Sequence, residues 1–529
     1  MPDPNAIYTR RGQKFDIADY PDAVQKLIRS KLKTVDQVIQ GLPRSFRFCS
    51  TLAMSQARGF LRKLSTRTDW EDVTHYGALT IEPYPILMNP HFRLISAYFS
   101  PLDRFVTERG AKTVSHMPRQ FTQLCDTIKT PGMIDYIVHT VTPPDAEGFV
   151  NLGVNCDIQW ESFRHFAQTK QTKIILEINS YVPWVNGHKD YDCNRIPLTW
   201  AECIYENHEP MPQLPPIVAT ETEERLAKNV LKYIKDGDTV QLGIGGVPNY
   251  IAEHLKDRRG LKFHSEMLTD AMVDLVNAGA VDNHGKAYMD GLTVGTFAAG
   301  TDKLYDWIDR NPEVVLLPIH AVNDPEVIGR NKRMKSINSA LMVDLHGQVC
   351  SDAVGFHQVS GIGGQLEFVM GAQRSEGGRS ILCIKSTSKV RDRLLSNVVV
   401  ALPAGSPVTV PRHFVDAIVT EWGAAEIKHL DAIRRARALV EIAHPSFRSG
   451  LVRKAKALGL WEHRPGFDTF KRRAMFNNLG YLRRLREALV GKTRAQRAKF
   501  IFKEIGKAMA APRRIQRFRD FCRQNRTWA

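Results

Sequence analysis

Short apolar runs that alternate with helical stretches are the feature of this sequence that most restricts its fold. From Phe46 onward, runs such as residues 136–138 and 173–178 stand between segments with helical periodicity. This alternation is typical of a parallel sheet that is covered by helices. The sequence therefore predicts an α/β fold.

The chain of 529 residues is too long for one ordinary hydrophobic core, and the usual domain size suggests roughly two to four domains. A proline-rich break at residues 214–216 interrupts the α/β pattern, and residues 220–223 have the spacing of a capping box that opens a new helix. We therefore predict an N-terminal α/β domain over residues 1–215 and a catalytic α/β domain over residues 216–460. Residues 461–529 are predicted to form a basic helical extension.

The second domain opens with a strand at residues 239–242, a glycine-rich turn at residues 243–248 and a helix at residues 249–255. A weaker copy of this unit lies in residues 39–64, where residues 49–54 replace the glycine-rich turn with Cys-Ser-Thr-Leu-Ala-Met. We interpret the two units as a degenerate internal repeat, in which only the second half kept its glycines. The active site is therefore expected to lie mainly on the second half.

Basic charge is concentrated at the C-terminal end. Residues 451–529 carry 22 Lys and Arg against 5 Asp and Glu, which accounts for the whole formal net charge of +17. Because the rest of the chain is neutral, the charge says nothing about the chemistry of the fold. Apolar residues such as Phe500, Ile505 and Met509 recur at helical spacing, so we expect the extension to pack on the body or on another subunit of a homo-oligomer. Binding to nucleic acid or to an anionic membrane is the alternative.

No run approaches the roughly 20 apolar residues that cross a bilayer, and the opening residues lack a hydrophobic signal segment. A cytoplasmic location is therefore predicted. The eight cysteines contain no C-x-x-C pair, which favours reduced thiols over a disulfide framework or a zinc site. We expect no structural metal.

Two glycine-rich turns flank one carboxylate, Glu266, in the second domain. Residues 243–246 and residues 361–364 both read Gly-Ile-Gly-Gly. In such a turn between a strand and a helix, backbone N–H groups face an anion or an oxyanion. Neither turn has the pattern of a dinucleotide site or a P-loop. The pair favours a ligand that needs both an anion cradle and an oxyanion hole, such as the acyl thioester of a phosphorylated carrier.

Each of these features also has a plain structural interpretation. A single glycine-rich turn is as often only a tight turn, and a lone glutamate more often caps a helix or lies on the surface. Asn323, which precedes Asp324 and Pro325, is equally well placed for an Asx-turn. The residues alone leave these alternatives open.

Eight motifs in one order resemble the acetyl-CoA hydrolase/transferase family, and within it the 4-hydroxybutyrate and acetate CoA-transferases. They are QLGIGGVP at residues 241–248, HSEM at 264–267, VNDP at 322–325, SINSAL at 336–341, GQVC at 347–350, SGIGGQ at 360–365, STSK at 386–389 and VTEWG at 419–423. The likeness is strong over residues 215–450 and looser in the first domain, where residues 141–148 carry it.

This resemblance implies a class I CoA-transferase fold of two related open α/β domains and a nucleophilic carboxylate at Glu266. It implies that Asn323 and the amide of Gly364 form the oxyanion hole for the thioester carbonyl. The residues that it assigns to CoA or substrate binding are Gly243, Ile244, Gly245, Gly361, Gly363, Lys389 and Glu421. It implies no metal and no cofactor beyond coenzyme A as a substrate.

On this resemblance the chain is expected to move CoA between an acyl-CoA, with acetyl-CoA as the leading donor, and a small carboxylic acid. The mechanism would be ping-pong through a glutamyl-CoA thioester. An acetyl-CoA hydrolase on the same fold and a non-catalytic CoA-binding protein recruited through the basic tail are the alternatives. Apolar residues near Ile244 and Val247 are expected to wall the acyl pocket and exclude water, which favours transfer.

Two features depart from the family pattern. Residues 49–54 lack glycine, although the first domain is expected to help shape the acyl pocket. A long segment also follows residues 443–448, where the family pattern ends. The first departure leaves the identity of the acyl acceptor open.

Overall fold

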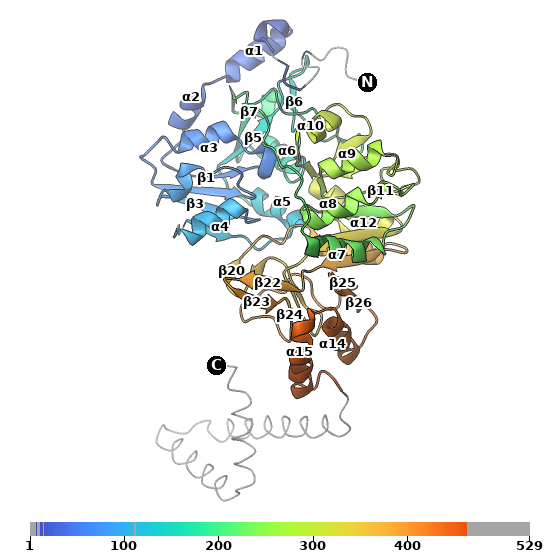
Figure 1. Ribbon diagram of the computed structural model, residues 1–529. Helices are drawn as coiled ribbons and strands as arrows, with labels where there is room; N and C mark the ends of the chain where they lie inside the picture. The colour runs from blue at the N-terminus through green and yellow to red at the C-terminus, as the bar shows by residue number, and fades with distance from the viewer. Residues whose placement is uncertain (1–6, 8–10, 14, 111–112, 463–529) are drawn as a thin grey trace, which may run out of the picture. The chain divides into compact units, whose positions relative to one another are not determined.

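Two open sheets follow one another along the chain and determine where the functional residues can meet (Figure 1). The computed structural model describes residues 7, 11–13, 15–110 and 113–462. The described residues up to 461 belong to one compact unit. Apart from its first two residues, the predicted basic extension lies outside the described residues, so its helical structure stays a prediction.

The first sheet has seven parallel strands in the order β4-β3-β2-β1-β5-β7-β9. Their bounds are β1 Ser45–Ser50, β2 Asp72–Gly77, β3 Phe92–Ser96, β4 Val114–His116, β5 Tyr136–Val141, β7 Lys173–Ile178 and β9 Cys203–Glu206. A separate antiparallel pair is formed by β6 Phe149–Asn151 and β8 Arg195–Pro197. The α-helices of this half are α1 Asp22–Lys31, α2 Val35–Gln40, α3 Arg58–Leu64, α4 Pro101–Glu108, α5 Phe121–Lys129 and α6 Gln159–Thr169.

The second sheet has six strands in the order β11-β10-β16-β21-β25-β26, and only its last pair is antiparallel. Its strands are β10 Thr239–Leu242, β11 Lys262–Phe263, β16 Met334–Ser339, β21 Arg379–Cys383, β25 Ala417–Thr420 and β26 Gly423–Glu426. Small side sheets are formed by β12 Met267–Leu268 with β14 Phe297–Ala298, β13 Thr293–Gly295 with β15 Val314–Leu316, β17 Met342–Asp344 with β18 Val349–Cys350 and β24 Val398–Val399, β19 Ala353–Val354 with β20 His357–Gln358, and β22 Thr387–Val390 with β23 Arg393–Ser396. The helices are α7 Glu221–Leu231, α8 Gly246–Glu253, α9 Asp270–Asn277, α10 Asp302–Ile308, α11 Ile319–Asn323, α12 Pro325–Arg330, α13 Gln365–Arg374, α14 Ala432–Glu441 and α15 Pro445–Ala457.

The order of strands reverses at the first strand of each sheet. In the first sheet β1 lies between β2 and β5, and in the second β10 lies between β11 and β16. Each central strand runs through a turn into a helix, α3 in the first half and α8 in the second. These are the two units that the sequence suggested as a repeat. Helix α8 begins at Gly246, earlier than predicted, because Gly245 occupies the N-cap with φ +119°.

The turn after β1 contains a left-handed backbone conformation without glycine, since Ala53 has φ +46°.

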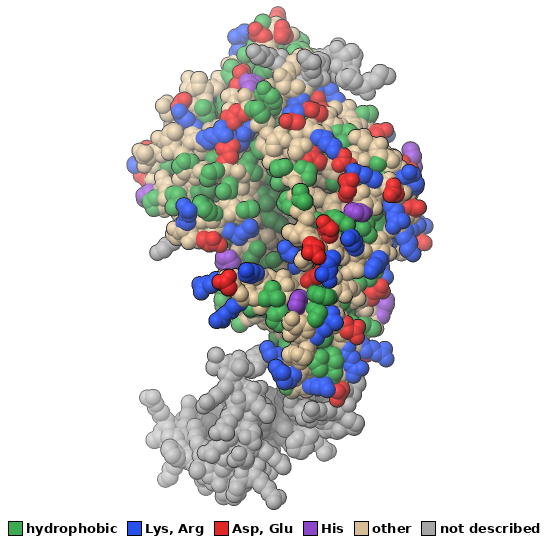
Figure 2. Space-filling model, in the orientation of Figure 1, with side chains coloured by type: hydrophobic (Ala, Val, Ile, Leu, Met, Phe, Trp, Pro, Cys, Tyr) green, Lys and Arg blue, Asp and Glu red, His purple; other side chains and the backbone are tan. Residues whose placement is uncertain are grey.

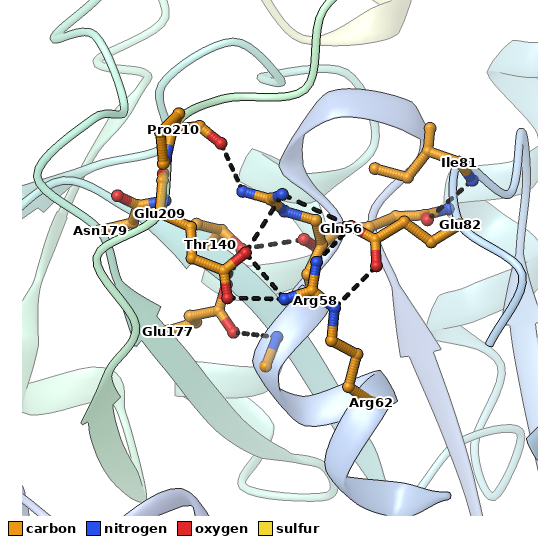
Figure 3. Close-up of polar contacts among 11 residues, drawn as sticks. Gln56, Arg58, Arg62, Ile81, Glu82, Thr140, Glu177, Asn179, Glu209 and Pro210 are labelled. Carbon is orange, nitrogen blue, oxygen red and sulfur yellow. Dashed lines mark hydrogen bonds and ion pairs between the residues drawn. The ribbon is translucent and has the colours of Figure 1, made fainter. Parts of the chain in front are cut away.

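A polar network holds helix α3, which follows this turn (Figure 3). Glu177, which is buried on β7, accepts hydrogen bonds from the Gly59 amide at 2.9 Å and from the Thr140 hydroxyl at 2.9 Å. Arg62 forms ion pairs with two further carboxylates, Glu82 and Glu209. The end of β1 is therefore fixed in place by side chains rather than by a glycine-rich turn.

One apolar core joins the two halves. It contains Ile137 and Leu176 from the first sheet together with Leu268, Leu316 and Phe368 from the second half. The predicted domain boundary near residue 215 falls in the chain between β9 and β10. The halves are therefore held together by buried side chains as well as by the connecting chain.

The surface of the described residues carries both signs of charge, as the neutral composition of residues 1–450 indicates. Acidic and basic side chains are mixed across the described face of Figure 2, and hydrophobic side chains line a central hollow. None of the described helices is both long enough and apolar enough to cross a bilayer. The described cysteines are free and buried; Cys522 lies outside the described residues.

Candidate active site

Glu266 lies where the chain leaves the edge of the second sheet. It stands between β11 and β12, and its carbonyl accepts the amides of Thr296 at 2.9 Å and Phe297 at 3.3 Å. Just before it, the Ser265 hydroxyl donates to the Leu242 carbonyl at 3.1 Å. Glu266 thus lies in a short connection between two small strands. The hydrogen bonds of the Glu266 carbonyl and the Ser265 hydroxyl fix the backbone that carries the Glu266 side chain.

The structure brings Glu266, Asn323 and Gly364 together. Asn323 Nδ2 donates to Glu266 Oε2 at 2.6 Å, and the backbone of Gly364 also hydrogen-bonds to this carboxylate. A Cβ atom at position 364 would lie inside van der Waals distance of both Glu266 Oε2 and Asn323 Nδ2. Only glycine therefore leaves room at position 364 for the Glu266 carboxylate and the Asn323 amide.

Asn323 is fully buried at the C-terminal end of α11. The turn before Pro325 is instead capped by Asp324, which accepts the amide of Glu326 at 2.7 Å. The Asx-turn that the sequence left open is therefore made by Asp324, and the Asn323 side chain is directed to the carboxylates.

Sequence reasoning missed Glu367, a second carboxylate in this cluster. It lies in the first turn of α13, is 2 % exposed, and accepts from Asn323 Nδ2 at 3.0 Å. Its other oxygen accepts from the amide and the hydroxyl of Thr122, which lies on α5 of the first half. The only signal in the sequence was an acid three positions after a helix-opening glycine. That signal is ordinary for helix N-termini.

The electrostatics of the cluster favour a protonated Glu266 at mildly acid pH. Burial raises the pKa of Glu266 to about 7; the hydrogen bond from Asn323 opposes the rise, and the negative charge of Glu367 adds to it. Burial also raises the pKa of Glu367. The two carboxylates thus share one amide donor, Asn323 Nδ2. Their protonation states are therefore coupled.

The second glycine-rich turn forms one wall of the site. Gly361 pairs with Tyr98 in an isolated bridge, and a Cβ at position 361 would collide with the Ala97 carbonyl. Gly363 has φ +55°, and its carbonyl accepts the amide of Phe121 at 3.3 Å. The turn therefore contacts the first half directly and presents Gly364 to Glu266.

The first glycine-rich turn lies near the site but does not touch the carboxylate. Ile244 and Gly245 line a groove together with Ile217, Asn249, Thr269 and Lys303. Gly243 connects β10 to this turn, and a Cβ there would meet no atom. Val247 does not line this groove, because the first turn of α8 buries it in the core.

Lys389 and Glu421 are not brought to Glu266. Lys389 lies on the β22–β23 hairpin, where its side chain is 70 % exposed and 3.9 Å from Asp392. Glu421 is buried and accepts the amide of Ser386 at 2.9 Å, at the base of that hairpin. Within the described part of the chain, no hydrogen bond or ion pair joins either residue to Glu266.

Family models match both halves of this chain. The acetyl-CoA hydrolase/transferase N-terminal domain matches residues 100–215, and the C-terminal domain of that family matches residues 300–455. A 4-hydroxybutyrate coenzyme A transferase from Clostridium kluyveri is 32% identical over 82% of this chain and 99% of that protein. The chain belongs to the acetyl-CoA hydrolase/transferase family. Asn323, Gly364 and Glu367 lie inside the matched C-terminal domain, whereas Glu266 lies between the two matched segments.

The fold agrees with this family. The crystal structure of RipA from Yersinia pestis superposes with a TM-score of 0.74 at 30% identity, over 83% of this chain and 99% of that one. The family also includes hydrolases: an acetyl-CoA hydrolase from Kluyveromyces lactis is 24% identical over 52% of this chain and 58% of that protein. Membership therefore makes the chain an enzyme of a CoA-transferase family with hydrolase relatives.

Proposed function

We propose that this enzyme transfers CoA between an acyl-CoA, with acetyl-CoA as a donor, and a small carboxylic acid. The observation that carries the proposal is the partly exposed Glu266 carboxylate, which is held by Asn323 Nδ2 at 2.6 Å and by the Gly364 backbone. A carboxylate freed from bulk water is a better nucleophile, and two fixed donors can stabilise the oxyanion that its own carbonyl forms later.

The reaction follows from this arrangement in four balanced steps. The Glu266 carboxylate attacks the thioester carbonyl, the C–S bond breaks, and a mixed anhydride and CoA thiolate result. The thiolate attacks the glutamyl carbonyl, which releases the first acid and leaves a glutamyl-CoA thioester. During this attack, negative charge develops on the oxygen that Asn323 and Gly364 face. A second carboxylate then attacks the glutamyl thioester, which forms a second mixed anhydride and releases the CoA thiolate. The thiolate attacks the acyl carbonyl of this anhydride, so the new acyl-CoA leaves and the Glu266 carboxylate is restored.

Transfer and hydrolysis differ in what attacks the glutamyl thioester. We expect transfer to exceed hydrolysis by at least about tenfold, which requires only about 1.4 kcal/mol of barrier difference. The measurement is release of free CoA from acetyl-CoA with and without a millimolar carboxylate acceptor, together with formation of the new thioester. Equal CoA release without acceptor, and no new thioester for any acid, would identify a hydrolase.

Exchange of Glu367 for glutamine is expected to shift the pH dependence of the first half-reaction. The Glu367 charge raises the pKa of Glu266, so its removal lowers that pKa and keeps Glu266 ionised at lower pH. The acid limb of thioester formation from acetyl-CoA should move down by roughly 0.5–1 pH unit. Single-turnover rates between pH 5 and 8 (roughly the range around the Glu266 pKa) measure the shift. Glu376→Gln, at an exposed ion pair with Lys332, is the control; an unmoved acid limb in Glu367→Gln contradicts the coupling.

A further inference from the structure

His264 is a fully buried side chain that the proposed reaction does not use, and it lies where the three segments of the active site meet. It stands two residues before the proposed nucleophile. Its Nε2 atom lies 2.7 Å from the carbonyl oxygen of Val322, the residue before Asn323. Its ring packs against the ring of Phe368, the residue after Glu367, at 6.2 Å between centroids. One side chain therefore contacts the immediate neighbours of both Asn323 and Glu367.

The contact with Val322 determines the state of the imidazole. A carbonyl oxygen only accepts, so Nε2 of His264 carries a proton and donates it to this bond. Nδ1 is buried and has no hydrogen-bond partner among the described residues. Burial and, after it, the positive charge of Lys286 lower the pKa of His264 to about 3. The imidazole is therefore neutral, and its single N–H is given to Val322.

The carbonyl that accepts this bond belongs to the helix that carries Asn323. Helix α11 has five residues, and the last four carbonyls of any α-helix lack a partner inside the helix. Val322 and Asn323 are both fully buried. The Val322 carbonyl and the Asn323 Cα atom lie in one planar peptide unit. The bond from His264 therefore orients the peptide plane from which the Asn323 side chain branches.

The other end of this link is fixed as well. The backbone amide of His264 donates to the Val240 carbonyl at 3.4 Å, on the neighbouring strand β10. Just before it, the buried ammonium group of Lys286 donates to the Phe263 carbonyl at 2.8 Å. The imidazole thus joins two backbone segments, one of which carries Glu266 and the other Asn323.

We propose that His264 is a positioning residue for thioester formation, which keeps Asn323 Nδ2 directed at the Glu266 carboxyl group by holding the Val322 peptide. The inference rests on the proposed CoA transfer. It gives His264 no contact with the substrate, so the whole effect of His264 on the reaction passes through Asn323.

A second histidine makes the same kind of bond elsewhere and provides a matched control. His139 is fully buried, its Nε2 lies 3.0 Å from the Leu152 carbonyl, and its Nδ1 has no partner within the described part of the chain. Both residues of this pair lie in the first half, and neither adjoins Asn323 or Glu367 in the sequence. Loss of the His139 bond should lower the free energy of unfolding and leave the chemistry unchanged.

Glutamine and asparagine at position 264 separate the reach of the donor from its polarity. The glutamine amide places an N–H group near the position of Nε2, whereas the shorter asparagine does not reach the Val322 carbonyl. In single-turnover formation of the glutamyl-CoA thioester from acetyl-CoA, we expect His264→Gln to stay within about threefold of the wild type. His264→Asn should lose roughly 10–100-fold with an unchanged KM, less than the loss of an oxyanion donor itself. His139→Asn should keep the wild-type rate.

A double-mutant cycle tests whether His264 acts through Asn323. Adding His264→Asn to Asn323→Ala should lower the rate by less than about twofold, because the donor that His264 positions is already absent. Losses that multiply in the double variant would overturn the proposal. So would equal losses in His264→Gln and His264→Asn, or a loss of similar size in His139→Asn.

Two further measurements keep these outcomes interpretable. Thermal unfolding of each variant checks the fold, and His264→Gln, which retains the donor, tests the proposal even if His264→Asn does not fold. Hydroxylamine trapping of the glutamyl-CoA thioester separates the two levels. Without a trapped thioester in the wild type, the proposed function fails and the role of His264 fails with it. If the wild type yields the thioester and His264→Asn forms it equally fast, only the role of His264 is overturned.

Discussion

Glu266→Gln is expected to lower CoA exchange by roughly 10⁴-fold or more, because an amide cannot form the acyl anhydride. The fold should persist, since glutamine has the same shape and its amide oxygen can still accept from Asn323.

The stability of the folded protein supplies a second readout for this variant. The raised pKa of Glu266 means that the folded protein binds more protons than the unfolded chain between the ordinary glutamate pKa and about 7. The contribution of Glu266 to the free energy of unfolding therefore falls as pH rises through that window. In Glu266→Gln the free energy of unfolding should lose this dependence on pH.

The decisive measurement for this variant is chemical. Wild-type protein incubated with acetyl-CoA and then with hydroxylamine or borohydride should be modified at Glu266, as mapped by mass spectrometry. Glu441→Gln, at an exposed position on α14, is the control and should exchange CoA normally. Near-normal turnover of Glu266→Gln, or modification of a different residue in the wild type, would remove Glu266 from the mechanism.

Gly364→Ala is expected to reduce the rate of thioester formation by about 10²–10³-fold, the range seen when an oxyanion donor is lost. Gly364 has φ −96°, which alanine adopts without strain. The whole effect therefore comes from the added methyl group, which must displace the Glu266 carboxylate or the Asn323 amide. Single-turnover kinetics and thermal unfolding, measured together, separate this local effect from loss of the fold.

Gly450→Ala provides the matched control for this substitution. A Cβ atom at Gly450 meets no atom within 4 Å, and its backbone lies inside α15. It should leave activity unchanged, because alanine is favoured over glycine in a helix. If Gly364→Ala reacts as fast as this control, the close packing around Glu266 is irrelevant to the chemistry.

Local signals in the sequence predicted local structure well. Thr220 caps α7 in a capping box with Glu223, as its spacing indicated. The apolar run at residues 417–420 forms β25 of the second sheet. By contrast, the apolar runs at residues 314–318 and 340–345 contain β15 and β17, which belong to small side sheets, because sheet membership depends on pairing between distant segments.

The central strand β16 was not predicted as a strand, because its sequence is largely polar. Lys335 is buried there, and its ammonium group donates to the Gly377 carbonyl at 2.9 Å. This contact between distant segments allows a polar residue to be buried in a central strand. The periodicity of the sequence alone does not reveal such a contact.

The candidate site was only partly visible in the sequence. Glu266, Asn323 and Gly364 come from three separate segments, so their meeting follows from the fold and was expected only through the family resemblance. Glu367 was missed because its partners, Asn323 and Thr122, lie far away in the sequence. Lys389 and Glu421 share a hairpin region away from the carboxylate, which motif positions could not show.

The contacts between the two halves bear on how such enzymes diversify. Two supports of the second half come from the first: Thr122 on α5 donates to Glu367, and the amide of Phe121 donates to the Gly363 carbonyl. Exchanging the whole first half for that of a relative would disturb both supports unless the donors at these two positions were kept. Single substitutions that leave Thr122 and Phe121 in place should therefore alter this enzyme with less loss of activity than recombination between genes.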